Sequence, residues 1–169
     1  MIFAKPSSEH EAVSLLKESQ GITRILGGGT DVLVQMKSGV TEPELIVDIK
    51  SIPGIKEINQ VNGGYEIGAA VSGSEFNNFP GLKEFTPGIA EAFDLIGSSQ
   101  IQGRCTLAGN LCNASPAADT IPAPRPSYIT PCSSTSQLYA IAFHPSLTTW
   151  CFSKACTATM PLGPFLIPE

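Results

Sequence analysis

Apolar and polar positions in the first part of the chain alternate between helical and strand spacing, and glycines separate the segments. Apolar residues recur on one face of residues 9–18 at the 3–4 residue spacing of a helix. Ser8 and Glu11, at the start of this range, fit a capping box. The pattern therefore predicts a helix over residues 9–18 that ends at Gly21.

Short apolar runs bounded by turn residues predict strands. They lie at residues 22–26, 45–49, 55–60 and 65–71. Gly63 and Gly64, between the last two runs, are typical of a hairpin turn. Two further helical regions are expected, one or two turns over residues 32–37 and a longer helix over residues 89–96, where apolar residues recur at i, i+3, i+4 and i+7.

This mixture of elements indicates an α+β fold. The predicted helices are too few, and several strands too directly connected, for a regular doubly wound array of alternating strands and helices. The expected organisation is an N-terminal α+β subdomain over residues 1–60, the start of a second subdomain over residues 61–123, and an unassigned tail over residues 124–169.

The tail differs in composition from the rest of the chain. Residues 1–123 carry 8 Lys/Arg and 14 Asp/Glu and hold 15 of the 16 glycines. Residues 124–169 carry 3 charged residues but 7 of the 14 prolines, and show no regular period apart from a short apolar stretch at residues 138–143. Three explanations stay open: a genuine irregular lobe, a flexible segment, or translation in a wrong reading frame.

Composition and charge exclude several classes of protein. With 42 % apolar and 15 % charged residues and a net charge of −5, the chain is globular and is not a basic nucleic-acid binder. Its apolar runs are too short to span a bilayer, and no secretory signal is evident at Met1, so cytoplasmic residence is expected. Its 5 cysteines form no Cys-x-x-Cys pair, which fits neither a disulfide framework nor a metal-cluster ligand set.

Residues 25–32, Ile-Leu-Gly-Gly-Gly-Thr-Asp-Val, are the first chemical candidate. Successive glycines let backbone N–H groups converge, and the following helix start adds partial positive charge, an arrangement that holds a phosphate without lysine. Because the chain is acidic overall, such local dipoles would have to supply the binding. The segment matches no standard phosphate motif, so a plain strand-to-helix turn is the alternative.

Residues 97–120 form a second candidate, a long stretch rich in small and hydrogen-bonding residues. Ala108 and Gly109 permit close backbone approach to a ligand. Side chains able to bind phosphate oxygens or sugar hydroxyls are Thr106, Asn110, Ser115, Asp119 and Thr120. The alternative is an irregular surface loop stabilised by its own side-chain-to-backbone hydrogen bonds.

Together, the two segments resemble the FAD-binding domain of the molybdenum hydroxylases, the flavin subunit of xanthine dehydrogenase and of aerobic carbon monoxide dehydrogenase. Residues 25–37 are similar to the family's first flavin loop, and residues 100–119 to its second. Residues 45–49, followed by Gly54, resemble the stretch between them. The resemblance covers residues 1–123, and nothing beyond them looks like the family's remaining strands or its C-terminal domain.

The resemblance implies a fold in which FAD lies between two α+β subdomains, the second of them incomplete here. It implies that both loops wrap the pyrophosphate and ribityl chain, that Asp119 binds sugar hydroxyls or ordered waters, and that Ile96 and Ile101 lie near the flavin. Ordinary core packing is the alternative for these isoleucines, and a helix N-cap the alternative for Asp119. The implied cofactor-binding residues are Ile25, Leu26, Gly27, Gly28, Gly29, Thr30, Asp31, Val32, Ile96, Ile101, Thr106, Leu107, Ala108, Gly109, Asn110 and Asp119.

Three positions depart from the family's pattern. Gln102 stands where a basic residue is common, Cys105 where Gly or Ala is common, and Ala108 where Gly is common. A methyl group at Ala108 is compatible with the loop only where φ is negative.

The function implied by the resemblance is electron transfer. Electrons would pass from a molybdopterin subunit and an iron–sulfur subunit to FAD, and from FAD to NAD⁺ or another acceptor. No catalytic side chain and no metal ligand is expected in this chain. The alternatives are a truncated, non-functional product and a stand-alone FAD-dependent oxidase.

Overall fold

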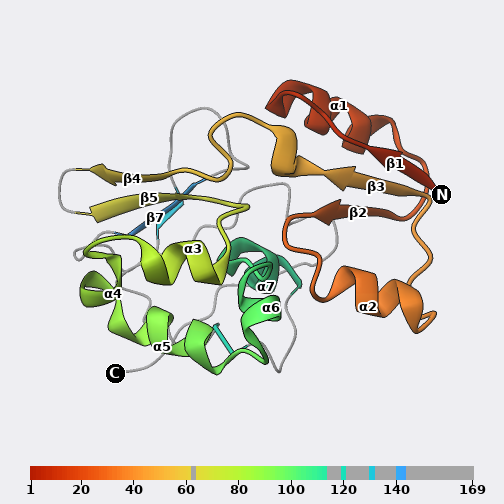
Figure 1. Cartoon of the computed structure of the whole chain (residues 1–169). Coiled ribbons are helices and arrows are strands. Elements are labelled where there is room, and N and C mark those ends of the chain that lie inside the picture. The colour runs from red at the N-terminus through yellow and green to blue at the C-terminus, as the bar shows by residue number, and fades with distance from the viewer. Residues whose placement is uncertain (62–63, 114–118, 121–129, 132–139, 144–169) are drawn as a thin grey trace, which may run out of the picture.

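The computed structural model describes residues 1–61, 64–113, 119–120, 130–131 and 140–143 (Figure 1). The described elements are short helices that pack against two separate sheets, one parallel and one antiparallel. The predicted α+β class is therefore confirmed. No helix in these residues is long and apolar enough to cross a membrane.

The first sheet is parallel and has the order β1–β3–β2. Its strands are β1 (Ile2–Ala4), β2 (Thr23–Leu26) and β3 (Leu45–Asp48), and β3 lies in the centre. Helix α1 (Glu9–Glu18) covers one face of the sheet, as Figure 1 shows. Its apolar side packs on β3 to form the first hydrophobic core, as expected for an amphipathic helix on a sheet.

The start of α1 differs in one detail from the predicted capping box. The Ser8 hydroxyl accepts the Glu11 N–H at 3.3 Å, as predicted. The Glu11 carboxylate, however, accepts from the N–H and the hydroxyl of Ser7, at 2.8 and 3.0 Å, rather than from Ser8. These hydrogen bonds from Ser7 stabilise the charged form and lower the pKa of Glu11.

The strand predicted over residues 55–60 begins three residues later, as β4 (Ile58–Val61). After β3 the chain forms the 3-10 helix η1 (Ile49–Ser51) and then a tight turn, where Gly54 has φ +79°. Ile55 is buried in the first core, so this residue serves packing rather than strand pairing.

The second sheet has the order β4–β5–β7–β6 and is antiparallel. The predicted hairpin is confirmed, because β4 pairs with β5 (Gly64–Gly68). Strand β7 (Ala140–Phe143) falls within the apolar stretch of the tail and pairs with both β5 and β6 (Thr130–Pro131). The other residues beyond 120 lie outside the described part.

The strand predicted over residues 65–71 ends at Gly68. A Cβ there would overlap the Ile55 carbonyl, so the two chain segments come close only because position 68 is glycine. Ala70 then donates to the Ile55 carbonyl at 2.9 Å, and Val71 donates back to Gly68 at 3.0 Å. These hydrogen bonds turn the chain away from the sheet and into the following helix.

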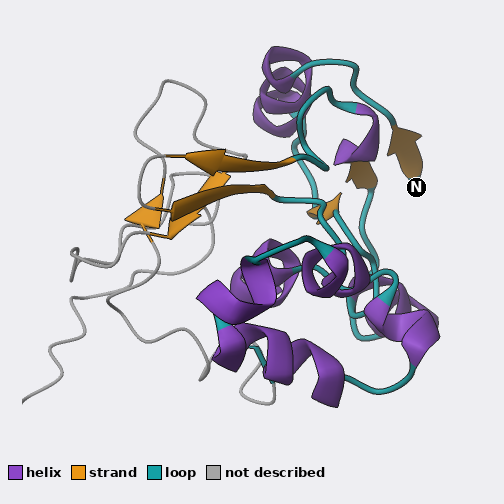
Figure 2. Ribbon diagram, turned by 60° about the vertical axis from the view of Figure 1, so that its left-hand side comes forward, coloured by secondary structure: helices purple, strands orange, loops and turns teal. Residues whose placement is uncertain are grey.

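Five short helices follow, and Figure 2 shows them gathered on one side of the second sheet. They are α3 (Gly73–Asn78), α4 (Leu82–Phe85), α5 (Pro87–Leu95), α6 (Ser99–Gln102) and α7 (Leu107–Asn113). Helix α5 confirms the helix predicted over residues 89–96. The other four were not predicted, although Ser72 and Glu75 form a complete capping box at the start of α3.

These helices and β5 enclose the second hydrophobic core. The rings of Phe76 on α3 and Phe93 on α5 lie 5.2 Å apart between centroids, and Gly73 allows the Phe93 ring to approach the α3 backbone.

The predicted boundary between subdomains, after residue 60, stays a prediction. It falls within β4, which pairs with the second sheet.

Replacing Phe93 with alanine should lower the free energy of unfolding by about 3–5 kcal/mol, because it opens a cavity in the second core. The matched control is Leu95→Ala on the same helix, whose side chain is 73 % exposed and which should change stability by less than about 0.5 kcal/mol. Urea denaturation of both variants measures the difference. Similar losses in the two variants would contradict this description of the core.

Candidate functional site

The glycine turn, defined as residues 27–31, connects β2 to helix α2 (Val32–Lys37). This is the strand, turn and helix order that the sequence predicts. Gly29 has φ +85°, which favours glycine, and its carbonyl accepts the Leu33 N–H at 3.2 Å as the helix begins.

The glycine turn presents backbone donors at the carboxyl end of a parallel strand. Within the described residues, the N–H groups of Gly28, Gly29 and Thr30 donate no hydrogen bond. Backbone N–H groups that lie on one turn and have no partner among the described residues are suited to binding an anion. The turn therefore has the donors that the sequence interpretation requires.

The second predicted segment lies directly against the glycine turn. A Cβ at Gly28 would overlap the Arg104 carbonyl oxygen, and a Cβ at Gly27 would lie 3.4 Å from Thr106 Oγ1. The segment is held on its other side by a bridge between Thr106 and Ser72. Two segments almost 80 residues apart in the chain thus meet at one place.

Thr106 immediately precedes helix α7 and is buried, with 3 % of its surface exposed. Its Oγ1 accepts the Gly109 N–H at 3.0 Å, and its carbonyl accepts the Asn110 N–H at 3.0 Å, the pattern of a helix N-cap. Among the described residues the Thr106 hydroxyl hydrogen has no acceptor. Ala108 lies inside α7, where φ is negative, so its methyl group is compatible with the backbone.

The end of the second segment folds back onto α7. Asn110 Nδ2 donates to Oγ1 of Thr120 at 2.9 Å, and Thr120 is fully buried. This hydrogen bond places the exposed Asp119 next to a residue anchored on α7. Ser115 lies outside the described residues.

The alternative for residues 97–120, an irregular surface loop, does not hold for the described part of this stretch. Residues 99–102 and 107–113 are helical. Cys105 and Leu107 belong to the second hydrophobic core.

Two contacts at the site were not predicted from the sequence. Gln35 Nε2 on α2 donates to Asn113 Oδ1 on α7 at 3.1 Å, which links the helix after the glycine turn to the helix within the second segment. Lys50 Nζ donates to the Gly27 carbonyl at 3.2 Å and lies 2.7 Å from Asp48 Oδ1. The Gln35–Asn113 and Lys50–Gly27 contacts join residues far apart in the sequence, so no local sequence pattern predicts them.

The two isoleucines of the predicted site have different surroundings. Ile96 is buried in the second core, whereas Ile101 is 39 % exposed. Gln102 donates from Nε2 to the carbonyls of Asp94 and Ile96, each at 3.1 Å. The glutamine that replaces the family's common basic residue thus uses its amide to cap the end of α5.

Cys105 lies between the glycine turn and the second core and is 1 % exposed. Burial raises the pKa of its thiol, an N–H donated by Gly73 opposes this, and the negative charge of Asp31 raises it further. The thiol therefore stays protonated to higher pH than an exposed cysteine. Within the described residues, no group of His, Cys, Asp or Glu could hold a metal ion.

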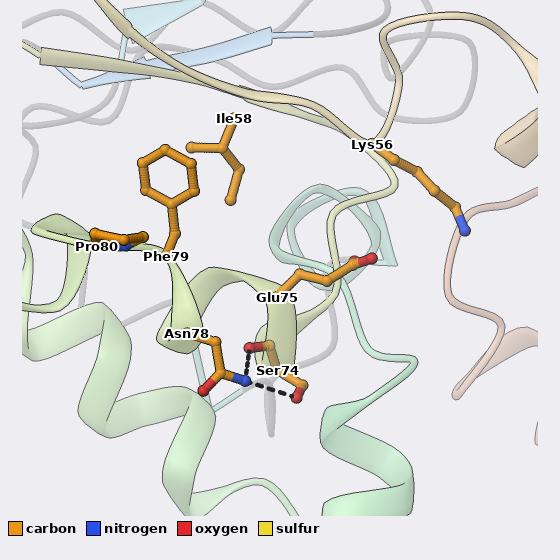
Figure 3. Close-up of a pocket in the computed structure, with 7 residues that line it drawn as sticks. All are labelled: Lys56, Ile58, Ser74, Glu75, Asn78, Phe79 and Pro80. Carbon is orange, nitrogen blue, oxygen red and sulfur yellow. Dashed lines mark hydrogen bonds between the residues drawn. The ribbon is translucent and has the colours of Figure 1, made fainter.

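A separate pocket of about 460 Å³ opens between β4 and α3 (Figure 3). It is lined by Lys56, Ile58, Ser74, Glu75, Asn78, Phe79 and Pro80. None of these is a predicted site residue. Asn78 donates to the carbonyl and hydroxyl of Ser74 on the same helix, so much of the polar lining is satisfied locally.

Comparison with known families gives a match over most of the chain. Residues 1–124 match the family model described as the FAD binding domain in molybdopterin dehydrogenase. The match ends within one residue of the region over which the sequence resembles that family.

Among curated proteins, the chain is similar to the carbon monoxide dehydrogenase medium chain of Hydrogenophaga pseudoflava, with 32 % identity over 114 residues, 68 % of this chain and 40 % of that protein. It is 29 % identical over 117 residues to caffeine dehydrogenase subunit beta of Pseudomonas sp. (strain CBB1), covering 69 % of this chain and 40 % of that protein. The chain thus spans about 40 % of the length of these relatives.

Solved structures have the same fold. A carbon monoxide dehydrogenase from Hydrogenophaga pseudoflava superposes with a TM-score of 0.71 at 28 % identity, over 76 % of this chain and 47 % of that one. The carbon monoxide dehydrogenase from Oligotropha carboxidovorans gives a TM-score of 0.70 at 25 % identity, over 88 % of this chain and 62 % of that one.

The variant Gly28→Ala should destabilise the chain by about 1–3 kcal/mol, because the added methyl group forces the glycine turn away from the Arg104 backbone. Gly103→Ala is the matched control. Gly103 has φ −69°, and nothing lies closer than 3.4 Å to the added carbon, so its effect should stay below about 0.5 kcal/mol. Chemical denaturation compares them, and equal effects would refute the proposed close approach.

Cys105 should react with iodoacetamide at pH 8 at least about tenfold more slowly than the exposed Cys112, because its thiol is buried and its pKa is raised. Mass spectrometry of the two alkylated peptides over time gives both rates. In denaturant the difference should disappear. Comparable rates in the native chain would show that Cys105 is accessible.

Proposed function

Because this chain belongs to the family of FAD-binding domains in molybdopterin dehydrogenases, we propose that it passes electrons from iron–sulfur clusters on partner subunits through FAD to NAD⁺ or another acceptor. Its cofactor is FAD, and its relatives are FAD-dependent oxidoreductase subunits. The single observation that best supports a role in holding this cofactor is the contact between the glycine turn and the Arg104–Cys105 backbone.

The geometry of this contact fits a pyrophosphate. Three backbone N–H groups without a partner among the described residues, those of Gly28, Gly29 and Thr30, lie on one turn. A chain with net charge −5 offers little long-range attraction for a dianion, so these local donors and the starts of α2 and α7 provide the binding. Residues 25–32 and 106–110 wrap the pyrophosphate and ribityl chain in this proposal.

Polar side chains of the second segment bind the hydroxyl groups of the cofactor. Thr106 has a hydroxyl hydrogen to donate, and Thr30 adds a second hydroxyl from the glycine turn. Asp119 is exposed next to the anchored Thr120, where its carboxylate accepts hydrogen bonds from sugar hydroxyls or ordered waters. Ile96 and Ile101 are the apolar residues assigned to the flavin side.

FAD supplies the redox chemistry by accepting electrons and releasing them to a second partner. The residues of this chain bind and orient it, and neither a protein nucleophile nor a general acid is required. The remaining groups come from a molybdopterin subunit and an iron–sulfur subunit in a heteromeric complex, which we place in the cytoplasm. Relatives named medium chain and subunit beta are in keeping with such a complex.

The full 169-residue chain, refolded with excess FAD, should retain one FAD per polypeptide after gel filtration, as measured from flavin absorbance. Gly28→Ala should lose most of this binding because the turn is displaced, whereas Gly103→Ala should keep it. A wild-type chain that retains no FAD would support the alternative of a truncated, non-functional product.

A second experiment separates electron transfer from a stand-alone oxidase. The flavin bound to this chain alone should stay oxidised when an organic substrate such as a purine or an aldehyde is added, because the hydroxylating centre lies on a partner. Anaerobic absorption spectra of the flavin band measure its oxidation state. NADH added to the same sample tests whether the flavin exchanges electrons with the nicotinamide cofactor. Reduction by the organic substrate without partners would favour the oxidase.

A further inference from the structure

Lys50 is fixed beside the glycine turn by two hydrogen bonds and an ion pair. Its Nζ donates to the Gly27 carbonyl at 3.2 Å and lies 2.7 Å from Asp48 Oδ1, and its backbone N–H donates to the same Oδ1 at 3.1 Å. Asp48 is buried, so its carboxylate has a fixed position at the end of β3. Asp48 therefore holds the Lys50 ammonium group in place, directed at the Gly27 carbonyl.

The Gly27 carbonyl and the Gly28 N–H belong to the same peptide unit. This unit is planar and trans, so the two groups point in opposite directions. With the carbonyl bound to Lys50, the Gly28 N–H points away from the lysine. A hydrogen bond from a charged donor to the carbonyl also polarises the peptide and makes its N–H a stronger donor.

Glycine residues on both sides of a peptide bond leave its orientation weakly determined, because neither has a side chain to restrict rotation. The Arg104 backbone fixes the position of the Gly28 Cα, but it does not select the direction of the preceding peptide plane. The hydrogen bond from Lys50 Nζ to the Gly27 carbonyl does select this direction.

We propose that Lys50 is a positioning residue for FAD, which locks the Gly27–Gly28 peptide so that the Gly28 N–H faces the cofactor's pyrophosphate. This inference rests on the proposed function. Lys50 also places one positive charge behind the turn, with Asp48 as its counter-ion, in a chain that is acidic overall. Its action on the pyrophosphate is through the peptide, and direct contact is not required.

Three variants of the full chain test the proposal. Lys50→Met removes the ammonium group and keeps the stem, Lys50→Arg keeps a positive donor, and Lys56→Met is the control because Lys56 lines the separate pocket of Figure 3. Fluorescence titration should show FAD affinity at least about tenfold lower for Lys50→Met, with much of the loss restored in Lys50→Arg and no change for Lys56→Met.

A direct readout distinguishes positioning from general loss of structure. At saturating FAD, the amide proton of Gly28 should shift downfield in the wild type and in Lys50→Arg, and clearly less in Lys50→Met. The thermal midpoint of the FAD-free chain should be the same in the wild type, Lys50→Arg and Lys56→Met. In Lys50→Met it should fall, because the buried Asp48 loses its counter-ion, but the chain should stay folded at the temperature of the titration.

Three results would overturn the inference. They are wild-type affinity in Lys50→Met, a downfield shift of the Gly28 amide in that variant as large as in the wild type, or a FAD-free Lys50→Met chain that is unfolded at the temperature of the titration. If the wild-type chain binds no FAD, the proposed function itself fails. If the wild type and Lys50→Met bind equally, only the role of Lys50 fails.

Discussion

The close approach of Gly28 to the Arg104–Cys105 backbone is the constraint on which the site depends. Gly28 belongs to the glycine turn, which follows strand β2 of the parallel sheet. Arg104 and Cys105 belong to the second segment, which is anchored through Ser72 and Gly73 to the helical core. No residue other than glycine fits at the contact. Each hydrophobic core therefore positions one half of the site, and the site exists only while both cores are folded.

The polar contacts around this point have a consistent arrangement. Lys50 holds the glycine turn from the side of the first sheet, and Gln35 joins α2 to Asn113 on α7. Thr106 uses its oxygen to cap α7 and retains its hydroxyl hydrogen. The backbone is thus fixed by side chains, while three N–H donors on the turn have no partner in the part of the chain that the structure describes, which is the preorganisation expected of a cofactor site.

Local sequence signals predicted much of the fold and both segments of the site. Helix α1 and the strand–turn–helix around residues 27–31 have their own caps, glycines and apolar periods. Helices α6 and α7 were missed because they are short and rich in small polar residues, and the packing of Leu107 in the second core, rather than any periodicity, holds α7. Lys50 was missed because a pairing across 23 residues leaves no local pattern.

Backbone hydrogen–deuterium exchange of the full chain, with and without FAD, shows whether the glycine turn and the second segment share one ligand. Residues 27–32 and 104–110 should gain protection together on addition of FAD, because one pyrophosphate binds where the two segments meet. Protection confined to one segment, or located instead around the pocket between β4 and α3, would contradict a shared cofactor site.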